Sequence, residues 1–366
     1  MRGIFLCGNI IKSVCVIIGT IIGAGFASGK EIEVFFVNFG KLGVYGIALA
    51  SIFTSIIIYY VLMKIRDTNI RNYNSYLNEM RIHNRIKDIS NAIINMFFLA
   101  SFYIMASGFC TYFKQEYNLN VIYVAIVLSV LCYITFLGKM EKITKINTIL
   151  IPFLILMVLI IGIKCNILDQ STENMVQISN KNWIISSLEY ASYNSILLIP
   201  IMIGLKKYTN KREKIVAVIS GAILFSLAMI LFLILAKEGS NIQYELPLIQ
   251  IVKQYGDIYK YIYGFVIVFA IFTSVIAAGY SFLENSTNSQ KKYKQLCFII
   301  CTGIVIACNI EFSYLIKVIY PVFGILGLIQ MVYFFVVDYK VLFVKLLKKM
   351  MKTDINRVEH RRRRSG

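Results

Sequence analysis

A cluster of glycines followed at once by two charged residues is the feature of this sequence most suited to chemistry. Gly19, Gly23, Gly25 and Gly29 fall within eleven residues, near the centre of an apolar segment. Each glycine weakens a helix by about 1 kcal/mol relative to alanine, so the cluster predicts an interrupted helix. If the segment crosses a bilayer, its freed N–H and C=O groups must face protein or a watery cavity, where carbonyl oxygens suit a cation. The alternative is close helix packing, because the glycines also have GxxxG spacing.

Lys30 and Glu31 come directly after this cluster and still lie inside the apolar segment. Ionisable groups at such depth are unfavourable unless they reach water or a partner. Adjacent helical residues point about 100° apart, so the two are not expected simply to neutralise each other. Lys30 can extend to the nearer membrane surface. Glu31 is therefore the predicted proton- or ion-coupling group of a pathway.

A second polar cluster occupies residues 186–195, at the midpoint of another apolar segment, and Pro200 follows it. Proline removes a helical hydrogen bond and clashes with the preceding turn. The cluster predicts a second discontinuous helix, broken near residues 193–195, with Tyr190 and Asn194 in the binding site. Glu189 is predicted as a second coupling carboxylate. The alternative is a proline kink whose Ser and Asn side chains bond to neighbouring helices.

A third, weaker cluster places the adjacent hydroxyls of Thr273 and Ser274 inside an apolar segment. With backbone carbonyls they can ligate Na⁺, although such hydroxyls also bond back to their own helix. Tyr103 lies inside a further apolar segment and is a candidate for the same site.

The elements that position these groups are apolar segments too long and too numerous for a soluble core. The chain of 366 residues is 58% hydrophobic and 16% charged, with a mean hydropathy of +0.70. Soluble domains are about 45–50% apolar and about 25% charged, and a membrane helix needs about 20 apolar residues. We predict an all-α membrane protein with ten transmembrane helices. They lie at about 9–39, 41–64, 88–113, 119–138, 146–164, 181–205, 212–236, 258–283, 295–310 and 314–338.

The charges between these segments predict the orientation. When connections are assigned to alternate sides, 29 of the 38 Lys and Arg residues lie on the side of the two termini. Cytoplasmic loops carry the excess of Lys and Arg, so both termini of this multi-pass cell-membrane protein are predicted to be cytoplasmic. We expect one transmembrane domain over residues 1–340 and a basic cytoplasmic tail over 341–366.

The segments also repeat in position. Those beginning near residues 9, 41 and 88 are followed by counterparts near 181, 212 and 258, an offset of about 170 residues. Each half has five segments, an odd number, so the second half enters from the opposite side, as in an inverted repeat. Repeat one covers about 9–164 and repeat two about 181–338.

The sequence lacks the motifs of several other classes of protein. The net charge is +19, and the charged residues lie between the apolar segments, which indicates membrane topology and not a nucleic-acid partner. The chain has two His, and its eight Cys show no CxxC pair. P-loop and HExxH motifs are absent, so neither ATP-driven transport nor an enzyme is predicted. No cofactor is expected other than a bound Na⁺ ion.

With these motifs placed, the chain resembles the YkvI family of bacterial membrane proteins over all ten segments. The resemblance rests on residues 18–31, Ile-Gly-Thr-Ile-Ile-Gly-Ala-Gly-Phe-Ala-Ser-Gly-Lys-Glu, and on Phe35-Phe36 through Gly40 and Gly43. That family resembles a branch of the amino acid–polyamine–organocation superfamily. Its LeuT-type fold has a 5+5 inverted repeat with helices 1 and 6 broken.

The resemblance implies a secondary transporter driven by Na⁺ or H⁺. It also implies one Na⁺ held by carbonyls and hydroxyls of helices 1 and 8. The implied ligands are Gly19, Ile22, Ala270, Thr273 and Ser274. The 186–195 cluster departs from many relatives because it has no glycine, which weakens the predicted break there.

The sequence therefore predicts an ion-coupled secondary active transporter of a small polar solute, an amino acid or a related amine. The alternative is a non-transporting membrane sensor on the same fold, similar to germinant receptors. The expected partners are the lipid bilayer and the small-molecule substrate. The predicted substrate site comprises Gly23, Ala24, Gly25, Phe26, Ser28, Gly29, Tyr103, Tyr190 and Asn194.

Overall fold

The computed structural model describes residues 2–66, 70, 73–79, 83–138, 141–165, 179–206, 211–237, 244–287 and 289–362. Side chains are described for these residues except 2–8, 24, 74, 141–151 and 338–362. Within these ranges the regular structure is helical, without strands. The first predicted span is a series of elements: α1 (Arg2–Ile21), α2 (Ala24–Ser28), α3 (Lys30–Phe35) and the 3-10 helix η1 (Val37–Phe39). The remaining helices are α4 (Leu42–Arg66), α5 (Tyr73–Glu79), α6 (Asn84–Tyr117), α7 (Val121–Leu137), α8 (Glu141–Lys164), α9 (Trp183–Ile203), α11 (Glu213–Lys237), α12 (Pro247–Lys253), α13 (Asp257–Ser286), α14 (Gln290–Ala307) and α15 (Phe312–Arg362).

Each predicted apolar segment coincides with one of these helices or, for the first, with the α1–η1 series. Five stretches are long and apolar enough to cross a membrane among the described residues: α4, α6, α11, α13 and Phe312–Val337 of α15. Asn9–Ile21, Val121–Leu137 and Pro152–Lys164 are shorter apolar helices. The first of these is the part of α1 whose side chains are described, and α1 ends at Ile21 because the glycine cluster divides the segment, as the sequence predicted.

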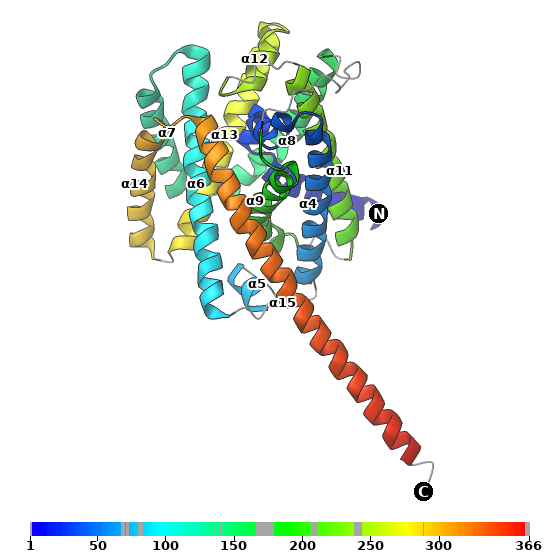
Figure 1. Ribbon diagram of the computed structural model, residues 1–366. Helices are drawn as coiled ribbons and strands as arrows, with labels where there is room; N and C mark the ends of the chain where they lie inside the picture. Colours follow the sequence, from blue (N-terminus) through cyan, green and yellow to red (C-terminus); the bar gives the residue numbers. More distant parts are fainter. Residues whose placement is uncertain are drawn as a thin grey trace.

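The helices form one bundle (Figure 1). α6 packs along α13, α15 packs on α9, and α4 contacts both α9 and α11. α7 and α14 pair on one flank of the bundle. α5 lies at one end, where it contacts α6 and α9, and α12 lies at the opposite end. We call these the α5 end and the α12 end; α15 extends past the α5 end (Figure 1).

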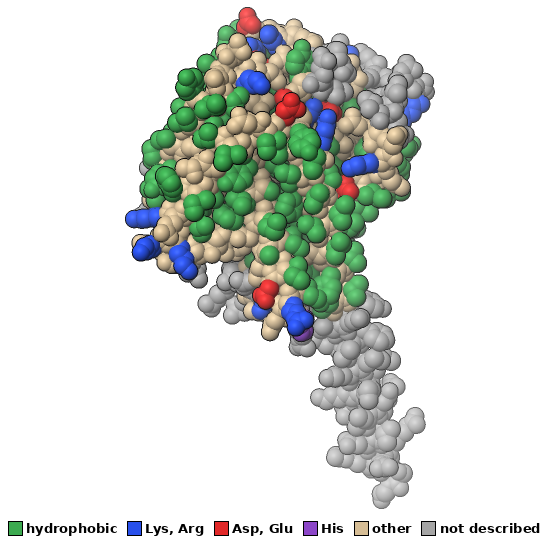
Figure 2. Space-filling model, turned by 60° about the vertical axis from the view of Figure 1, so that its left-hand side comes forward, with side chains coloured by type: hydrophobic (Ala, Val, Ile, Leu, Met, Phe, Trp, Pro, Cys, Tyr) green, Lys and Arg blue, Asp and Glu red, His purple; other side chains and the backbone are tan. Residues whose placement is uncertain are grey.

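The surface of the bundle has the apolar belt that a lipid environment requires. Figure 2 shows hydrophobic side chains over the middle of one face, with most Lys and Arg side chains nearer its ends. Large apolar side chains are more than half exposed on several helices, including Ile52 on α4, Phe265 on α13 and Ile299 on α14. Apolar surface of this extent is unfavourable in water and is stabilised by contact with lipid.

Candidate functional site

The first membrane segment changes direction at two glycines. α1 ends at Ile21, and Gly23, with extended backbone (φ −86°, ψ −171°), is the N-cap of α2. α2 has five residues and ends at Ser28; its C-cap is Gly29, whose φ of +83° is left-handed and therefore favours glycine. The interruption that the glycine cluster predicted is thus a sharp break at Ile22–Gly23, followed by one short helix and a left-handed turn. A hydrogen bond from a side chain stabilises the short helix α2: Ser28 Oγ donates to the Gly25 carbonyl at 2.9 Å.

The turn at Gly29 brings Glu31 on α3 back against α2. Glu31 is buried, with 3% of its surface exposed, and its carboxyl group lies beside the Cα atom of Gly25. A Cβ atom at residue 25 would collide with Oε1 of Glu31 and would lie 2.6 Å from its Cδ. Only glycine at this position therefore allows the carboxyl group to occupy its observed place.

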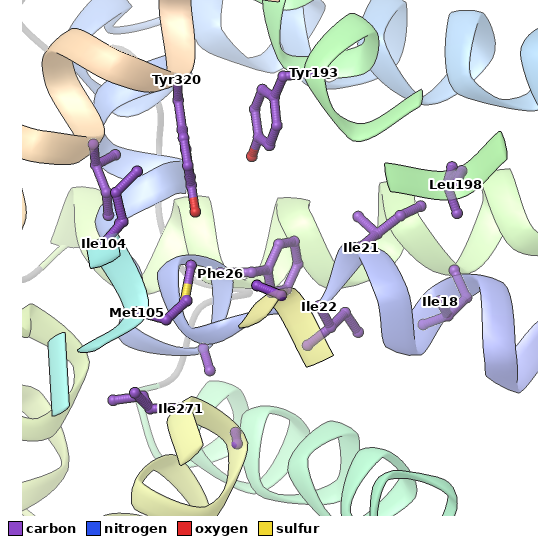
Figure 3. Close-up of a cluster of buried hydrophobic side chains, with 14 of the residues drawn as sticks. Ile18, Ile21, Ile22, Phe26, Ile104, Met105, Tyr193, Leu198, Ile271 and Tyr320 are labelled. Atoms are coloured by element: carbon purple, nitrogen blue, oxygen red, sulfur yellow. The ribbon is translucent and has the colours of Figure 1, made fainter. Parts of the chain in front are cut away.

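Tyrosines from α9 and α15 surround the carboxyl group. Tyr193 Oη donates a hydrogen bond of 2.7 Å to Glu31 Oε2. The Tyr193 ring stacks on Tyr320, with centroids 4.7 Å apart and planes 25° apart. Tyr190 packs edge-on against Tyr193 at 5.5 Å. In Figure 3 the hydroxyl oxygens of Tyr193 and Tyr320 are directed towards the chain near Ile22 and Phe26.

A cavity of about 300 Å³ lies beside this cluster. Glu31, Tyr193 and Tyr320 line one part of it, and Cys15 and Ile201 line another. The α9 lining extends from Tyr193 towards the end of that helix, and α5 contacts α9. The cavity therefore extends from the helix break towards the α5 end. Its lining comprises Cys15, Val16, Gly19, Thr20, Ile21, Gly23, Glu31, Phe98, Ser101, Met105, Tyr193, Asn194, Leu197, Ile201, Ser274, Ala277, Ala278, Ser281 and Tyr320.

Polar contacts close the structure towards the α12 end. The Lys30 ammonium forms a buried ion pair of 2.6 Å with Glu33 and donates to the Tyr244 carbonyl at 3.1 Å. Tyr263 on α13 donates from its hydroxyl to the Ala27 carbonyl. Lys30 is thus directed to the loop before α12 and is not directed at the Glu31 carboxyl group, although the two residues are adjacent.

The structure brings together part of the predicted site. Gly19, Gly23, Glu31, Asn194 and Ser274 line the cavity. Gly25 is buried directly beside Glu31. The other predicted residues are not part of the lining: Ile22, Phe26, Ser28, Gly29, Tyr103, Tyr190, Glu189, Ala270 and Thr273. The side chain of Ala24 lies outside the described side chains.

Two of these residues point elsewhere in the bundle. Glu189 packs against α15, where a Cβ atom at Gly324 would lie only 2.7 Å from the Glu189 Cβ. Tyr103 has its hydroxyl against Gly303 of α14. Glu31 is therefore the predicted carboxylate that reaches the cavity, and Glu189 lies on the α15-facing side of α9.

The predicted break near residues 193–195 is wrong. α9 is one continuous helix from Trp183 to Ile203. Asn194 Nδ2 donates to the Tyr190 carbonyl and Ser195 Oγ to the Ser192 carbonyl of the same helix, whereas Ser186 Oγ donates to the Phe35 carbonyl at 3.0 Å. Pro200 lies in the last turn, where it removes one backbone donor without ending the helix.

The proposed Na⁺ ligands lie on neighbouring elements. Ser274 Oγ is the atom closest to a Cβ built on Gly23, at 4.0 Å, so α13 faces the helix break. Ser274 Oγ donates to the Ala270 carbonyl at 2.8 Å and Thr273 Oγ1 to the same carbonyl at 3.1 Å. These are the back-bonds that the sequence left as an alternative to ion ligation.

Sequence reasoning did not select Tyr193 and Tyr320 as site residues. Tyr193 stood in the noted polar cluster, but Tyr320 comes from the last membrane segment. A tyrosine immediately before Pro321 within an apolar helix was the available signal, because a buried phenol requires a polar neighbour.

Replacing Tyr193 with Phe tests the contact to Glu31. The variant removes the one described hydrogen-bond donor to the buried carboxyl group, so we expect a loss of about 1–3 kcal/mol in the free energy of unfolding. Tyr123→Phe on α7 is the control, because Tyr123 is 71% exposed. Thermal denaturation in detergent measures both; equal midpoints for the two variants would show that the bond does not stabilise the fold.

Comparison with known proteins gives homologues of unknown activity. No protein-family model matches the chain. The chain is 27% identical over 324 residues to the uncharacterized membrane protein YkvI of Bacillus subtilis (strain 168), covering 86% of this chain and 91% of that protein. It is 26% identical over 326 residues to the uncharacterized protein YyaD of the same strain, covering 88% and 94%. The predicted resemblance to YkvI proteins is confirmed.

Solved structures share the fold at low sequence identity. A Na⁺-coupled sialic acid symporter in a substrate-bound outward-open state aligns with a TM-score of 0.54 at 13% identity, covering 86% of this chain and 75% of that one. MHP1, a nucleobase-cation-symport-1 family transporter in a closed conformation with bromovinylhydantoin bound, aligns with a TM-score of 0.51 at 13% identity, covering 87% and 70%. Both are transporters and not enzymes. The chain is a multi-pass membrane protein with their fold.

Proposed function

We propose that this chain is a secondary active transporter that couples movement of a small polar solute, an amino acid or related amine, to Na⁺ or H⁺. The observation that carries the proposal is the cavity at the break of the first membrane segment. It holds a buried carboxyl group, Glu31, in the middle of a bundle whose fold is found in ion-coupled symporters. Interrupted membrane helices are where transporters of this kind bind their substrates and ions.

The proposed topology has ten spans in a 5+5 inverted repeat, with both termini in the cytoplasm. The excess of Lys and Arg on the side of the termini supports this orientation. The α5 end is then cytoplasmic, and the cavity opens towards the cytoplasm while the α12 end is closed. Alternating access would then close the cytoplasmic path along α1 and α9 and open the contacts of Lys30.

Burial of Glu31 supports ion coupling at this site. An ionised carboxylate in a low-dielectric interior requires a bound cation, and the same group can instead take up a proton. Either event changes the charge in the cavity, which is the requirement for coupling a solute to Na⁺ or H⁺. The second proposed ion site, Gly19, Ile22, Ala270, Thr273 and Ser274, is supported by the approach of α13 to the break. Glu189 is the weaker candidate because it packs on α15.

Transport by the purified full-length chain in liposomes tests the proposal. We expect labelled amino acids or monoamines to accumulate when an inward Na⁺ or H⁺ gradient is imposed, and not when an ionophore collapses that gradient. Protein-free liposomes are the control for leakage. Ligand binding without gradient-driven uptake of any such solute would contradict transport and would leave the non-transporting sensor.

A further inference from the structure

We infer that the cavity selects a small monoamine cation with an apolar body, whose ammonium group binds the Glu31 carboxylate. This inference deepens the proposed transport function and rests on it in treating the cavity as the substrate site. Three observations carry it: the charge of the lining, the arrangement of the tyrosines, and the apolar character of the rest of the wall.

The charge of the lining favours a cation. Glu31 is the one charged side chain among the described residues that line the cavity, and no Lys, Arg or His is among them. The adjacent Lys30 is paired with Glu33 at 2.6 Å, on the side of the α12 end. A carboxylate without a fixed cation in a low-dielectric site attracts a positively charged ligand and repels an anion.

The polar atoms around Glu31 suit an ammonium group. Tyr193 holds one carboxylate oxygen by a bond of 2.7 Å. The hydroxyl of Tyr320 forms no hydrogen bond among the described residues and is directed towards the break (Figure 3). Asn194 uses its Nδ2 to bond the Tyr190 carbonyl, which leaves its Oδ1 as an acceptor. Carboxylate, phenol and amide oxygens all accept from N–H, and tyrosine rings add cation–π attraction.

The tyrosines are held in place before a ligand arrives. Tyr193 stacks on Tyr320, and Phe97 packs against Tyr320 at 6.3 Å. Phe35 and Tyr190 pack against the Tyr193 ring at 5.6 and 5.5 Å. This second layer of rings fixes the rotamers of the first, so little conformational entropy is lost on binding.

The remainder of the cavity is apolar and of limited size. Val16, Leu197 and Ile201 line the part nearer the α5 end, with Phe98 and Met105 from α6. A second ammonium group would meet no carboxylate there, so a diamine would lose the solvation of one charge without compensation. A cavity of about 300 Å³ also lies at the small end of ligand sites.

A matched ligand series tests this inference on the purified full-length protein in detergent. The probes are 3-methylbutylamine (cation), leucine (zwitterion), 3-methylbutanol (neutral), 3-methylbutanoate (anion) and cadaverine (dication), measured by calorimetry and thermal shift. We expect 3-methylbutylamine to bind at least about tenfold more tightly than each of the others, because only it satisfies both the carboxylate and the apolar wall. Leucine, 3-methylbutanol, 3-methylbutanoate or cadaverine binding as tightly as the monoamine would overturn the inference.

Glu31→Gln provides the matched variant. The neutral amide should weaken 3-methylbutylamine binding by about 30-fold or more and should abolish its advantage over 3-methylbutanol. Glu284→Gln is the control, because it removes the same charge from an exposed position on α13 and should leave binding unchanged. If Glu31→Gln does not fold, the ligand series on the unmodified protein still decides the question.

The outcome separates this inference from the transport proposal. Selective monoamine binding without gradient-driven uptake would support the proposed monoamine site and contradict the proposed transport function. Gradient-driven uptake of a zwitterion or anion, without selectivity for the monoamine, would retain transport and overturn the site chemistry.

Discussion

Gly25→Ala is expected to weaken 3-methylbutylamine binding by at least about tenfold while the protein stays folded. The added methyl group would occupy the place of the Glu31 carboxyl group, since a Cβ there lies 2.6 Å from Glu31 Cδ. The carboxyl group must then rotate away from Tyr193 and from the cavity. The helix itself tolerates the change, because alanine is a better helix former than glycine.

Gly204→Ala, the same substitution at a residue outside the cavity lining, is the matched control. A Cβ atom at Gly204 meets no atom closer than the Ile201 carbonyl oxygen at 3.4 Å, and its φ of −66° suits any L-residue. We expect this variant to bind within about twofold of the unmodified protein. Calorimetry gives the affinities, and thermal denaturation checks the fold. Equal affinities for the two variants would contradict the proposed position of the Glu31 carboxyl group.

Gly324→Val is expected to produce the largest loss of stability. α15 approaches α9 so closely that a Cβ at Gly324 would lie 2.8 Å from both the Cα and the carbonyl oxygen of Glu189. Backbone atoms cannot rotate away, so the two helices must separate. Overpacking of this kind costs about 1–3 kcal/mol and more where backbone must move, which lowers the thermal midpoint by roughly 5 °C or more.

The separation would also disturb the site, because Tyr193 belongs to α9 and Tyr320 to α15. Gly204→Ala is the control at the end of α9, where the nearest atom to a new Cβ is the Ile201 carbonyl oxygen at 3.4 Å. Denaturation in detergent and recovery of monodisperse protein measure both variants. If the Gly324→Val and Gly204→Ala variants had the same thermal midpoint, α15 and α9 would not pack as described.

The sequence predicted the break in the first segment because glycine acts locally. Four glycines within one turn-rich stretch lower helix stability whatever surrounds them, and the structure breaks at Gly23 and turns at Gly29. The same local reasoning failed for residues 186–195. Asn194 and Ser195 bond to carbonyls of their own helix, whereas Ser186 bonds to the Phe35 carbonyl, and the choice between own and neighbouring carbonyls depends on what packs beside each side chain.

The sequence alone predicted the apolar helical segments and that Glu31 must face protein or a cavity, because a carboxyl group in hydrocarbon is strongly unfavourable. Which of two carboxyl groups reaches the cavity was decided by tertiary structure: Glu31 lies beside Tyr193, and Glu189 of α9 packs against α15. The stacking of Tyr193 on Tyr320 was likewise decided there. The physical reason is that a membrane helix can be apolar on every side. Its sequence then carries no amphipathic stripe to fix its rotation, and packing against neighbouring helices sets which residues meet.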